Sequence, residues 1–325
     1  MRPPVGRIAA VSPRPEAGFS LVEVMASLAI FLIAMVAVFA TFTSQQKTFT
    51  DQSRVAEMQQ NLRQGVEFLM RDVRMAGYGI PDNVAIPNGT IATGVTSVRA
   101  LYAKDNTTGP DQVYVLYRFD MDSNQPPTQL NSDMAAYNTG ISVDNVYGFD
   151  NGDLILVATD TNADMFQVTA TPAGNSLPHN TSGYNAVGAH PAFPGYLVAT
   201  PAVVAKARFN RFFIDNTTDP DHPTLMVDRL NGYAPQPVAD DIEDLQLTYG
   251  IDTGGDGVVD AWTSAPGTPS QIRQVRLQMS ARARMPDREW RETRPALGNR
   301  PGGTTTDGYR RRVIDVVIDV RNSGI

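Results

Sequence analysis

A 24-residue apolar segment near the amino terminus places the strongest constraint on this chain. Residues 19–42 read FSLVEVMASLAIFLIAMVAVFATF, with neither glycine nor proline and with Glu23 as the only charge. As an α-helix rising about 1.5 Å per residue, the segment is about 36 Å long, enough to cross a hydrocarbon core of about 30 Å. The 18 residues before it carry three arginines and one glutamate. We therefore expect the amino terminus to stay in the cytoplasm and the rest of the chain to be exported.

Glu23 distinguishes this segment from a plain signal or anchor. A cleavable secretory signal has a shorter apolar region, about 7–15 residues, and ends in small residues at the cleavage site, which this segment lacks. An uncleaved signal anchor has a suitable length. However, a carboxylate at the bilayer centre costs roughly 2.5–3.5 kcal/mol, so we interpret Glu23 as a functional residue.

The sequence after the apolar segment predicts that the helix continues and packs on a globular head. Apolar residues recur at spacings of three and four, at Val55, Met58, Leu62, Val66, Leu69, Val73 and Ala76. This spacing places them on one face of an amphipathic helix. Residues 77–81 read GYGIP, and such glycines and a proline are expected to end the helix.

Beyond residue 81 the sequence changes to short β-type runs between turn-forming residues. Alternation is clear in residues 313–320, which read VIDVVIDV. We predict strands over residues 97–102, 112–119, 153–159, 165–171, 203–214, 224–230, 245–251, 272–283 and 311–320. The long stretches 83–93 and 173–194 are interpreted as loops inserted in one sheet. The predicted fold is α+β, with a long N-terminal helix packed on an antiparallel β-rich head.

The residues around Glu23 resemble the signal of type IV prepilins. Residues 18–25 read GFSLVEVM and precede the apolar helix, as in that family. The resemblance implies that prepilin peptidase cleaves after Gly18 and methylates the new amino terminus at Phe19. It also implies that Glu23 recruits the subunit into the filament. A carboxylate in an apolar bundle needs a cationic partner, which the α-amino group of a neighbouring subunit's Phe19 can supply.

Three stretches beyond the signal resemble the PilW family of minor pilins and, more distantly, the J-type pseudopilins of type II secretion. They are RDVRMAGY at 71–78, GDLILV at 152–157 and DIEDLQLTYGID at 241–252. The resemblance implies a type IV pilin-like fold.

The same resemblance implies a leader peptide at 1–18, a helix at 19–78 that spans the membrane over 19–42, and a periplasmic or extracellular head at 79–325. The implied partners are prepilin peptidase, the major pilin, other minor pilins, the inner-membrane assembly platform and inner-membrane lipid.

The function that the resemblance implies is structural. A minor pilin would wait in the inner membrane with its leader cytoplasmic and its head periplasmic, and then join the filament or its tip to prime assembly. Two alternatives stay open. One is a type II secretion pseudopilin, and the other is a tip module that binds a surface or DNA through the loops 83–93 and 173–194.

One stretch has part of the pattern of a calcium loop. Counted from Asp252, an EF-type loop would take ligands from Asp252, Asp256, the Val258 carbonyl and Asp260. Positions 3 and 12 of that loop, Gly254 and Ser264, cannot supply the usual carboxylates. A glycine-rich β-hairpin turn with solvated acids explains the same residues, so both interpretations are kept.

Composition and motifs favour no enzymatic or nucleic-acid function. The chain has no cysteine and none of the common hydrolase, phosphate-loop or zinc-protease motifs. Its net charge of −7 argues against sequence-independent nucleic-acid binding, which needs a basic surface. One basic run, interleaved with Met285, Trp290 and acids, consists of Arg282, Arg284, Arg288, Arg291 and Arg294. We interpret this run as a solvated rim or a subunit contact.

Overall fold

The computed structural model describes residues 18–81, 84–85, 100–119, 127–190 and 192–320. The predicted leader, apart from Gly18, lies outside the described residues, as does most of the predicted loop 83–93. The chain divides into two compact units, Met1–Ser53 and Arg54–Ile325. They are described separately.

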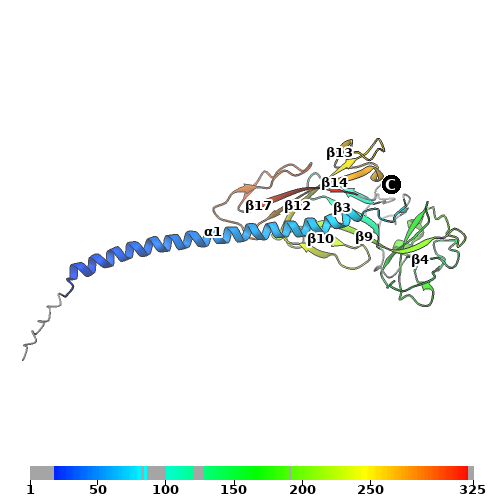
Figure 1. Ribbon diagram of the computed structural model, residues 1–325, viewed down its shortest axis with the longest axis horizontal. Helices are drawn as coiled ribbons and strands as arrows, with labels where there is room; N and C mark the ends of the chain where they lie inside the picture. Colours follow the sequence, from blue (N-terminus) through cyan, green and yellow to red (C-terminus); the bar gives the residue numbers. More distant parts are fainter. Residues whose placement is uncertain (1–17, 82–83, 86–99, 120–126, 191, 321–325) are drawn as a thin grey trace, which may run out of the picture. The chain divides into compact units, whose positions relative to one another are not determined.

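One helix, α1 (Leu21–Met75), supplies the described secondary structure of the first unit and continues into the second (Figure 1). In the first unit its side chains are exposed from Leu21 to Thr50, including large apolar residues such as Phe31 and Phe39. An apolar helix with no protein covering it is stable only in a membrane or against other apolar surfaces. By length and composition this helix is able to cross a membrane.

In the second unit, one face of α1 is buried, as the apolar spacing predicts. Six of the seven predicted residues are buried and Val55 is partly buried. Gly65 lies on the same face, where an added Cβ would come within 3.1 Å of Met279 Sδ and 3.2 Å of Leu225 Cδ2. The absence of a side chain at Gly65 therefore lets the helix approach both sheets closely. The helix ends at Met75, and Gly77 follows with a φ of 78°.

Within the described residues, the larger sheet of the head has nine strands. Its main path is β1-β7-β6-β9-β10-β11, with β2 paired to β3, and with β3 and β4 paired to β9. All pairs are antiparallel except β1–β7. The strands are β1 (Val84–Ala85), β2 (Leu101–Lys104), β3 (Gln112–Arg118), β4 (Thr128–Gln129), β6 (Leu154–Ala158), β7 (Ala163–Gln167), β9 (Val203–Asp215), β10 (Thr224–Asp228) and β11 (Gln236–Ala239).

A second, antiparallel sheet has the order β13-β12-β14-β17. Its strands are β12 (Ile242–Ile251), β13 (Ala261–Thr263), β14 (Ile272–Arg282) and β17 (Arg311–Asp319). Two small pairs are β5 (Ile141–Ser142) with β8 (Ser176–Leu177), and β15 (Glu292–Thr293) with β16 (Thr306–Asp307). Three short 3₁₀ turns are η1 (Gly183–Asn185), η2 (Val187–Ala189) and η3 (Pro269–Gln271).

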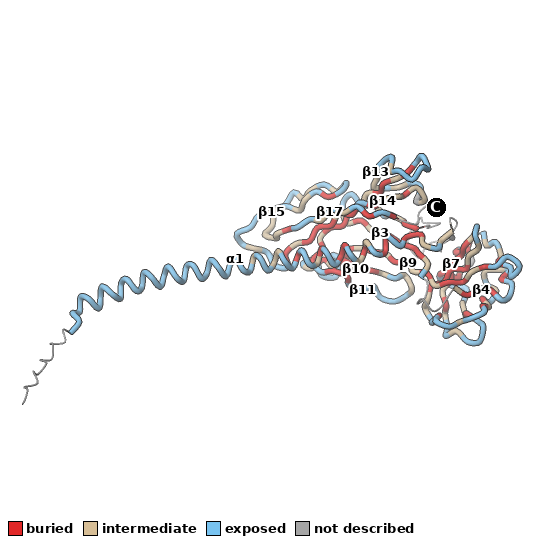
Figure 2. Tube along the Cα trace, in the orientation of Figure 1, coloured by how far each residue is buried: buried red, intermediate tan, exposed pale blue. Residues whose placement is uncertain are grey.

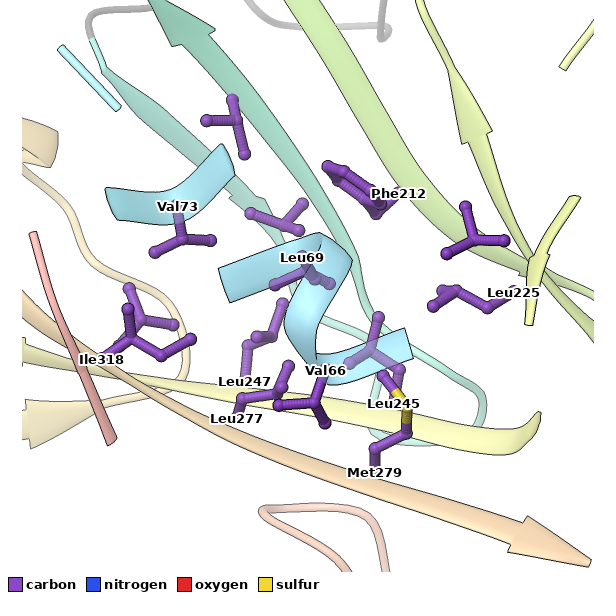
Figure 3. Packing of buried hydrophobic residues seen from close by; sticks show 14 of the residues in the cluster. Val66, Leu69, Val73, Phe212, Leu225, Leu245, Leu247, Leu277, Met279 and Ile318 are labelled. Carbon is purple, nitrogen blue, oxygen red and sulfur yellow. The ribbon is translucent and has the colours of Figure 1, made fainter. Parts of the chain in front are cut away.

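The main core lies between α1 and both sheets. Figure 3 shows Val66, Leu69 and Val73 of the helix among side chains of the two sheets: Phe212, Leu225, Leu245, Leu247, Leu277, Met279 and Ile318. Leu69 and Val73 are fully buried. Each such side chain stabilises the fold by about 1.5–3 kcal/mol. The helix is thus an integral part of the head's core.

The predicted α+β fold is confirmed, and each predicted strand region overlaps a strand, although residues 97–99 of the first region lie outside the described residues. The largest error concerns residues 165–171, because β7 occupies Ala163–Gln167. The stretch 173–194 was predicted as a loop, yet it contains β8, η1 and η2. A few of its side chains, such as Tyr184 and His190, are buried, while many others are exposed.

Candidate processing and assembly site

The predicted cleavage position lies in an extended segment just before α1. Gly18, Phe19 and Ser20 precede the first helical residue. A Cβ added to Gly18 would meet no atom within 4 Å, and the Phe19 side chain is 87% exposed. No described residue therefore shields this peptide bond from an enzyme.

Glu23 forms a capping box with Ser20 at the start of the helix. Glu23 Oε2 accepts hydrogen bonds from the Ser20 backbone N–H at 3.0 Å and from the Ser20 hydroxyl at 3.1 Å. In return, Ser20 Oγ accepts from the Glu23 backbone N–H at 3.2 Å. This reciprocal pair satisfies two backbone donors that helix formation leaves free.

The sequence prediction missed Ser20, although the S-x-x-E spacing before an apolar run is a known signal of a capping box. Within the described residues no cation forms an ion pair with Glu23. In the single subunit, the Glu23 carboxylate therefore has a neutral hydrogen-bond partner, Ser20. A cation from another subunit would be a second partner.

The stretch 71–78 joins α1 to the larger sheet through a buried acid. Asp72 is 1% exposed and accepts hydrogen bonds from Asn210 Nδ2 on β9 at 2.5 Å and from the Tyr117 hydroxyl on β3 at 3.3 Å. Burial raises the pKa of Asp72, against the lowering effect of its contacts with Asn210, Arg71 and Tyr117. The stretch therefore has a structural role at the helix–sheet junction.

The acids at 241–252 are also engaged inside the head. Glu243 forms a two-point ion pair with Arg311 of β17, at 2.7 Å to Nε and 2.9 Å to Nη2. Arg311 also binds Asp307, and this hydrogen bond lowers the pKa of that carboxyl. Because the Arg311 side chain is only 2% exposed, the network ties β12, β17 and the β15–β16 pair together in a partly dehydrated setting.

Asp244 has the same role toward the segment that connects β14 to β17. Its carboxylate is fully buried and lies 3.1 Å from Arg294 Nη1 and 2.9 Å from Arg300 Nη1. Removing one partner of such a buried pair leaves an uncompensated charge. The acids of this stretch therefore fix a long connection instead of forming an accessible reaction site.

The possible calcium loop brings two of its acids together. Asp252 Oδ1 and Asp260 Oδ2 both flank Gly254, at 4.0 and 3.7 Å from the position of an added Cβ. Each already has donors: Asp252 accepts from two backbone N–H groups and Arg273, and Asp260 accepts from Thr253 and Gly254. Asp256 bonds instead to the backbone N–H of Val258. Among described residues, no group of three or more His, Cys, Asp and Glu side chains is arranged to hold a metal. Calcium binding stays a prediction.

One buried cluster resembles a catalytic relay in its chemistry. His190 Nδ1 lies 2.8 Å from Asp164 Oδ1, and Asp164 Oδ2 accepts a 2.6 Å hydrogen bond from the Tyr196 hydroxyl. All three side chains are buried, and His190 stacks on Phe166 at a centroid distance of 4.3 Å. Phe193 also packs edge-on against His190 and Tyr196, so the cluster lies within aromatic packing.

Comparisons with known proteins match both ends of the chain. A family model described as type IV pilus-assembly protein W matches residues 211–322, and one described as the prokaryotic N-terminal methylation motif matches residues 13–39. Among solved structures, a type IV-like pilin from Thermus thermophilus is similar over 82% of this chain and 96% of its own, with 13% identity and a TM-score of 0.38. No curated protein matches the sequence.

Proposed function

The chain belongs to the PilW family of type IV pilus-assembly proteins, and on that premise we propose that it is a minor pilin that primes filament assembly. Prepilin peptidase removes residues 1–18 and methylates Phe19. The processed subunit spans the inner membrane over 19–42 with its head in the periplasm. It then joins the major pilin and other minor pilins at the inner-membrane assembly platform.

The observation that carries this proposal is the arrangement around the predicted cleavage position. An accessible Gly18–Phe19 bond precedes an apolar helix that has no covering within its own unit, and Glu23 lies in the first turn. A carboxylate in apolar surroundings is stabilised by a cation, and the new α-amino group of a neighbouring Phe19 provides one. Cleavage and recruitment are thereby linked, because only a cleaved neighbour presents that charge.

The cleavage step is tested by Gly18→Arg in cells that carry the pilus system. We expect the variant to accumulate with its leader attached, as detected by intact-protein mass spectrometry. Gly140→Arg is a matched control, because an added Cβ there also meets no atom within 4 Å. Normal cleavage of Gly18→Arg would contradict the proposed processing.

The recruitment step is tested by Glu23→Ala. We expect normal cleavage and membrane insertion but loss of the subunit from sheared pili. Glu57→Ala, which removes an exposed carboxylate of the same helix, should be incorporated normally. Equal incorporation of the two variants would contradict the role of Glu23.

Low copy number and a position near the tip belong to the same proposal. A head that begins near residue 79 and includes two sheets is harder to repeat along a tightly packed filament than a small one. Quantitative mass spectrometry of sheared pili measures the ratio to the major pilin, and a ratio near one would contradict a minor role. A deletion that abolishes enzyme secretion and leaves pili intact would instead indicate a type II secretion pseudopilin.

A further inference from the structure

The segment between β14 and β17 concentrates positive charge in an otherwise acidic protein. We call residues 283–310 the arm. From Arg282 to Arg312 the sequence contains nine arginines and four acids, in a chain of net charge −7. The β15–β16 pair and the hydrogen bond from the Asp287 backbone N–H to the Gly308 carbonyl, at 2.7 Å, give the arm a defined structure.

Several arginines of the arm have structural partners. Arg294 and Arg300 bind the buried Asp244, and Arg310 pairs with Asp287 while its guanidinium lies 4.3 Å from the centre of the Trp290 ring. These contacts account for the arm's stability.

Two arginines at the surface of the arm lack such a partner. Arg288 and Arg291 are exposed, and in the described part of the chain no ion pair joins either to a carboxylate. Arg291 Nη1 donates to the backbone carbonyls of Arg288 and Trp290, which fixes the turn. Beside them, Met285 is 65% exposed and Trp290 is 37% exposed. Exposed cationic and large apolar side chains thus occur within residues 285–291, which we call the arm surface.

This surface belongs to the end of the head at which α1 enters. Asn61, near the start of the buried part of the helix, donates a 3.0 Å hydrogen bond to the Asp240 carbonyl. The next residue, Asp241, lies 3.6 Å from Arg284 Nη1 at the base of the arm. Figure 2 shows β15 at this same end of the second unit.

We propose that the arm binds the phosphate headgroups of the membrane in which the waiting subunit is anchored. The inference rests on the proposed function, which places residues 19–42 in the bilayer. Only eleven residues lie between Phe42 and Arg54, the first residue of the second unit, so the connection keeps the start of the head close to the proposed membrane span.

The chemistry of the arm fits this partner. Guanidinium groups bind phosphate oxygens at two points, and tryptophan is favoured at the membrane–water interface. An acidic surface of another subunit would satisfy the arginines but gives no reason for exposed Met285 and Trp290 beside them. Contact with lipid would orient the head before assembly and would be released when the subunit leaves the bilayer.

The two tryptophans of the chain provide the test. Trp290 lies in the arm, whereas Trp262 lies on β13, opposite Gly250 and thus at the far end of β12 from Ile242. Trp262→Phe leaves Trp290 as the reporter, and Trp290→Phe leaves Trp262 as its matched control. The full chain is reconstituted in vesicles of phosphatidylcholine, with or without phosphatidylglycerol, that contain a headgroup spin-labelled lipid as quencher.

We expect the spin label to quench Trp290 strongly in vesicles with phosphatidylglycerol, less without it and less at high salt, and to leave Trp262 unaffected. The double variant Arg288→Ala, Arg291→Ala should lower the ratio of lipid-bound arm to free arm about thirtyfold. Lys104→Ala with Arg229→Ala removes the same charge from exposed positions outside the arm and should change little.

Three results would overturn the proposal, and they are distinguishable. If the chain floats with the vesicles but Trp290 is no more quenched than Trp262, the arm does not bind lipid although the anchor is intact. If the chain does not float at all, the membrane anchor in the proposed function fails as well. If Trp290 is shielded only after other pilin subunits are added, the partner of the arm is protein.

Discussion

Asp72→Ala is expected to destabilise the head, because Asp72 is a buried acid through which α1 bonds to β3 and β9 of the larger sheet. Alanine leaves the amide of Asn210 and the hydroxyl of Tyr117 without the acceptors that now lie at 2.5 and 3.3 Å. A buried donor without an acceptor costs about 1–3 kcal/mol. Part of this loss is offset, because burial raises the pKa of Asp72 and alanine removes the cost of burying its charge. We expect a net loss of about 2–4 kcal/mol.

The assay is thermal unfolding of the full chain in detergent, followed by circular dichroism. A loss of this size lowers the melting temperature of a unit with more than 200 residues by roughly 5–10 °C. Glu67→Ala is the control, because Glu67 is an exposed carboxylate on the opposite, polar face of α1. Its effect should stay within about 0.5 kcal/mol.

Asp72→Asn separates the hydrogen bonds from the charge. Its amide oxygen accepts from Asn210 and its amide nitrogen donates to the Tyr117 oxygen, so it should melt near the wild-type temperature at acidic pH. The folded pKa of Asp72 lies above its unfolded value of about 3.9, so the aspartate loses stability as pH rises through the folded pKa. The asparagine variant should therefore gain stability relative to wild type as pH rises. Equal melting of Asp72→Ala and Glu67→Ala would refute the reasoning.

Three further predictions concern the head. Leu69→Ala, at a fully buried position, should cost about 2–5 kcal/mol by chemical denaturation. Burial raises the pKa of Asp111 to about 7, so its contribution to stability is complete below about pH 4 and is lost progressively as pH rises from there through 7. The melting temperature should therefore fall between about pH 4 and 7, and less so for Asp111→Asn. If the loop 252–260 binds calcium, saturation at 100 times the dissociation constant should add about 2.7 kcal/mol; equal melting with calcium and with chelator would contradict the calcium hypothesis.

The regular parts of this fold are readable from sequence because they are periodic. Spacings of three and four predicted the buried face of α1, and alternation predicted the long strands such as β9, β14 and β17. Two-residue strands such as β5 and β8 have no period to detect, and they form because distant segments meet across a core. The stretch 173–194 was therefore predicted as a loop.

In the candidate site too, the local sequence signal was predictable and the long-range contacts were not. The signal around Glu23 is contiguous and was predicted, whereas Ser20 was missed although its spacing to Glu23 was available. The partners of the acids at 241–252 are separated from them in sequence, since Glu243 and Arg311 are 68 residues apart. No local pattern encodes such a pair, so its structural role emerges only from the packing of β12 against the rest of the sheet.

Two carboxylates on apolar faces of the same helix show how context assigns their roles. Asp72 is enclosed by its own head, and donors from β3 and β9 satisfy it within the chain. Glu23 has only the neutral, local bonds to Ser20, and the helix around it has no covering in its own unit. Neutral bonds compensate a charge in apolar surroundings less than an ion pair does. On the proposed function, a neighbouring subunit's α-amino group supplies the remaining stabilisation of Glu23, whereas Asp72 has its hydrogen-bond partners within the head.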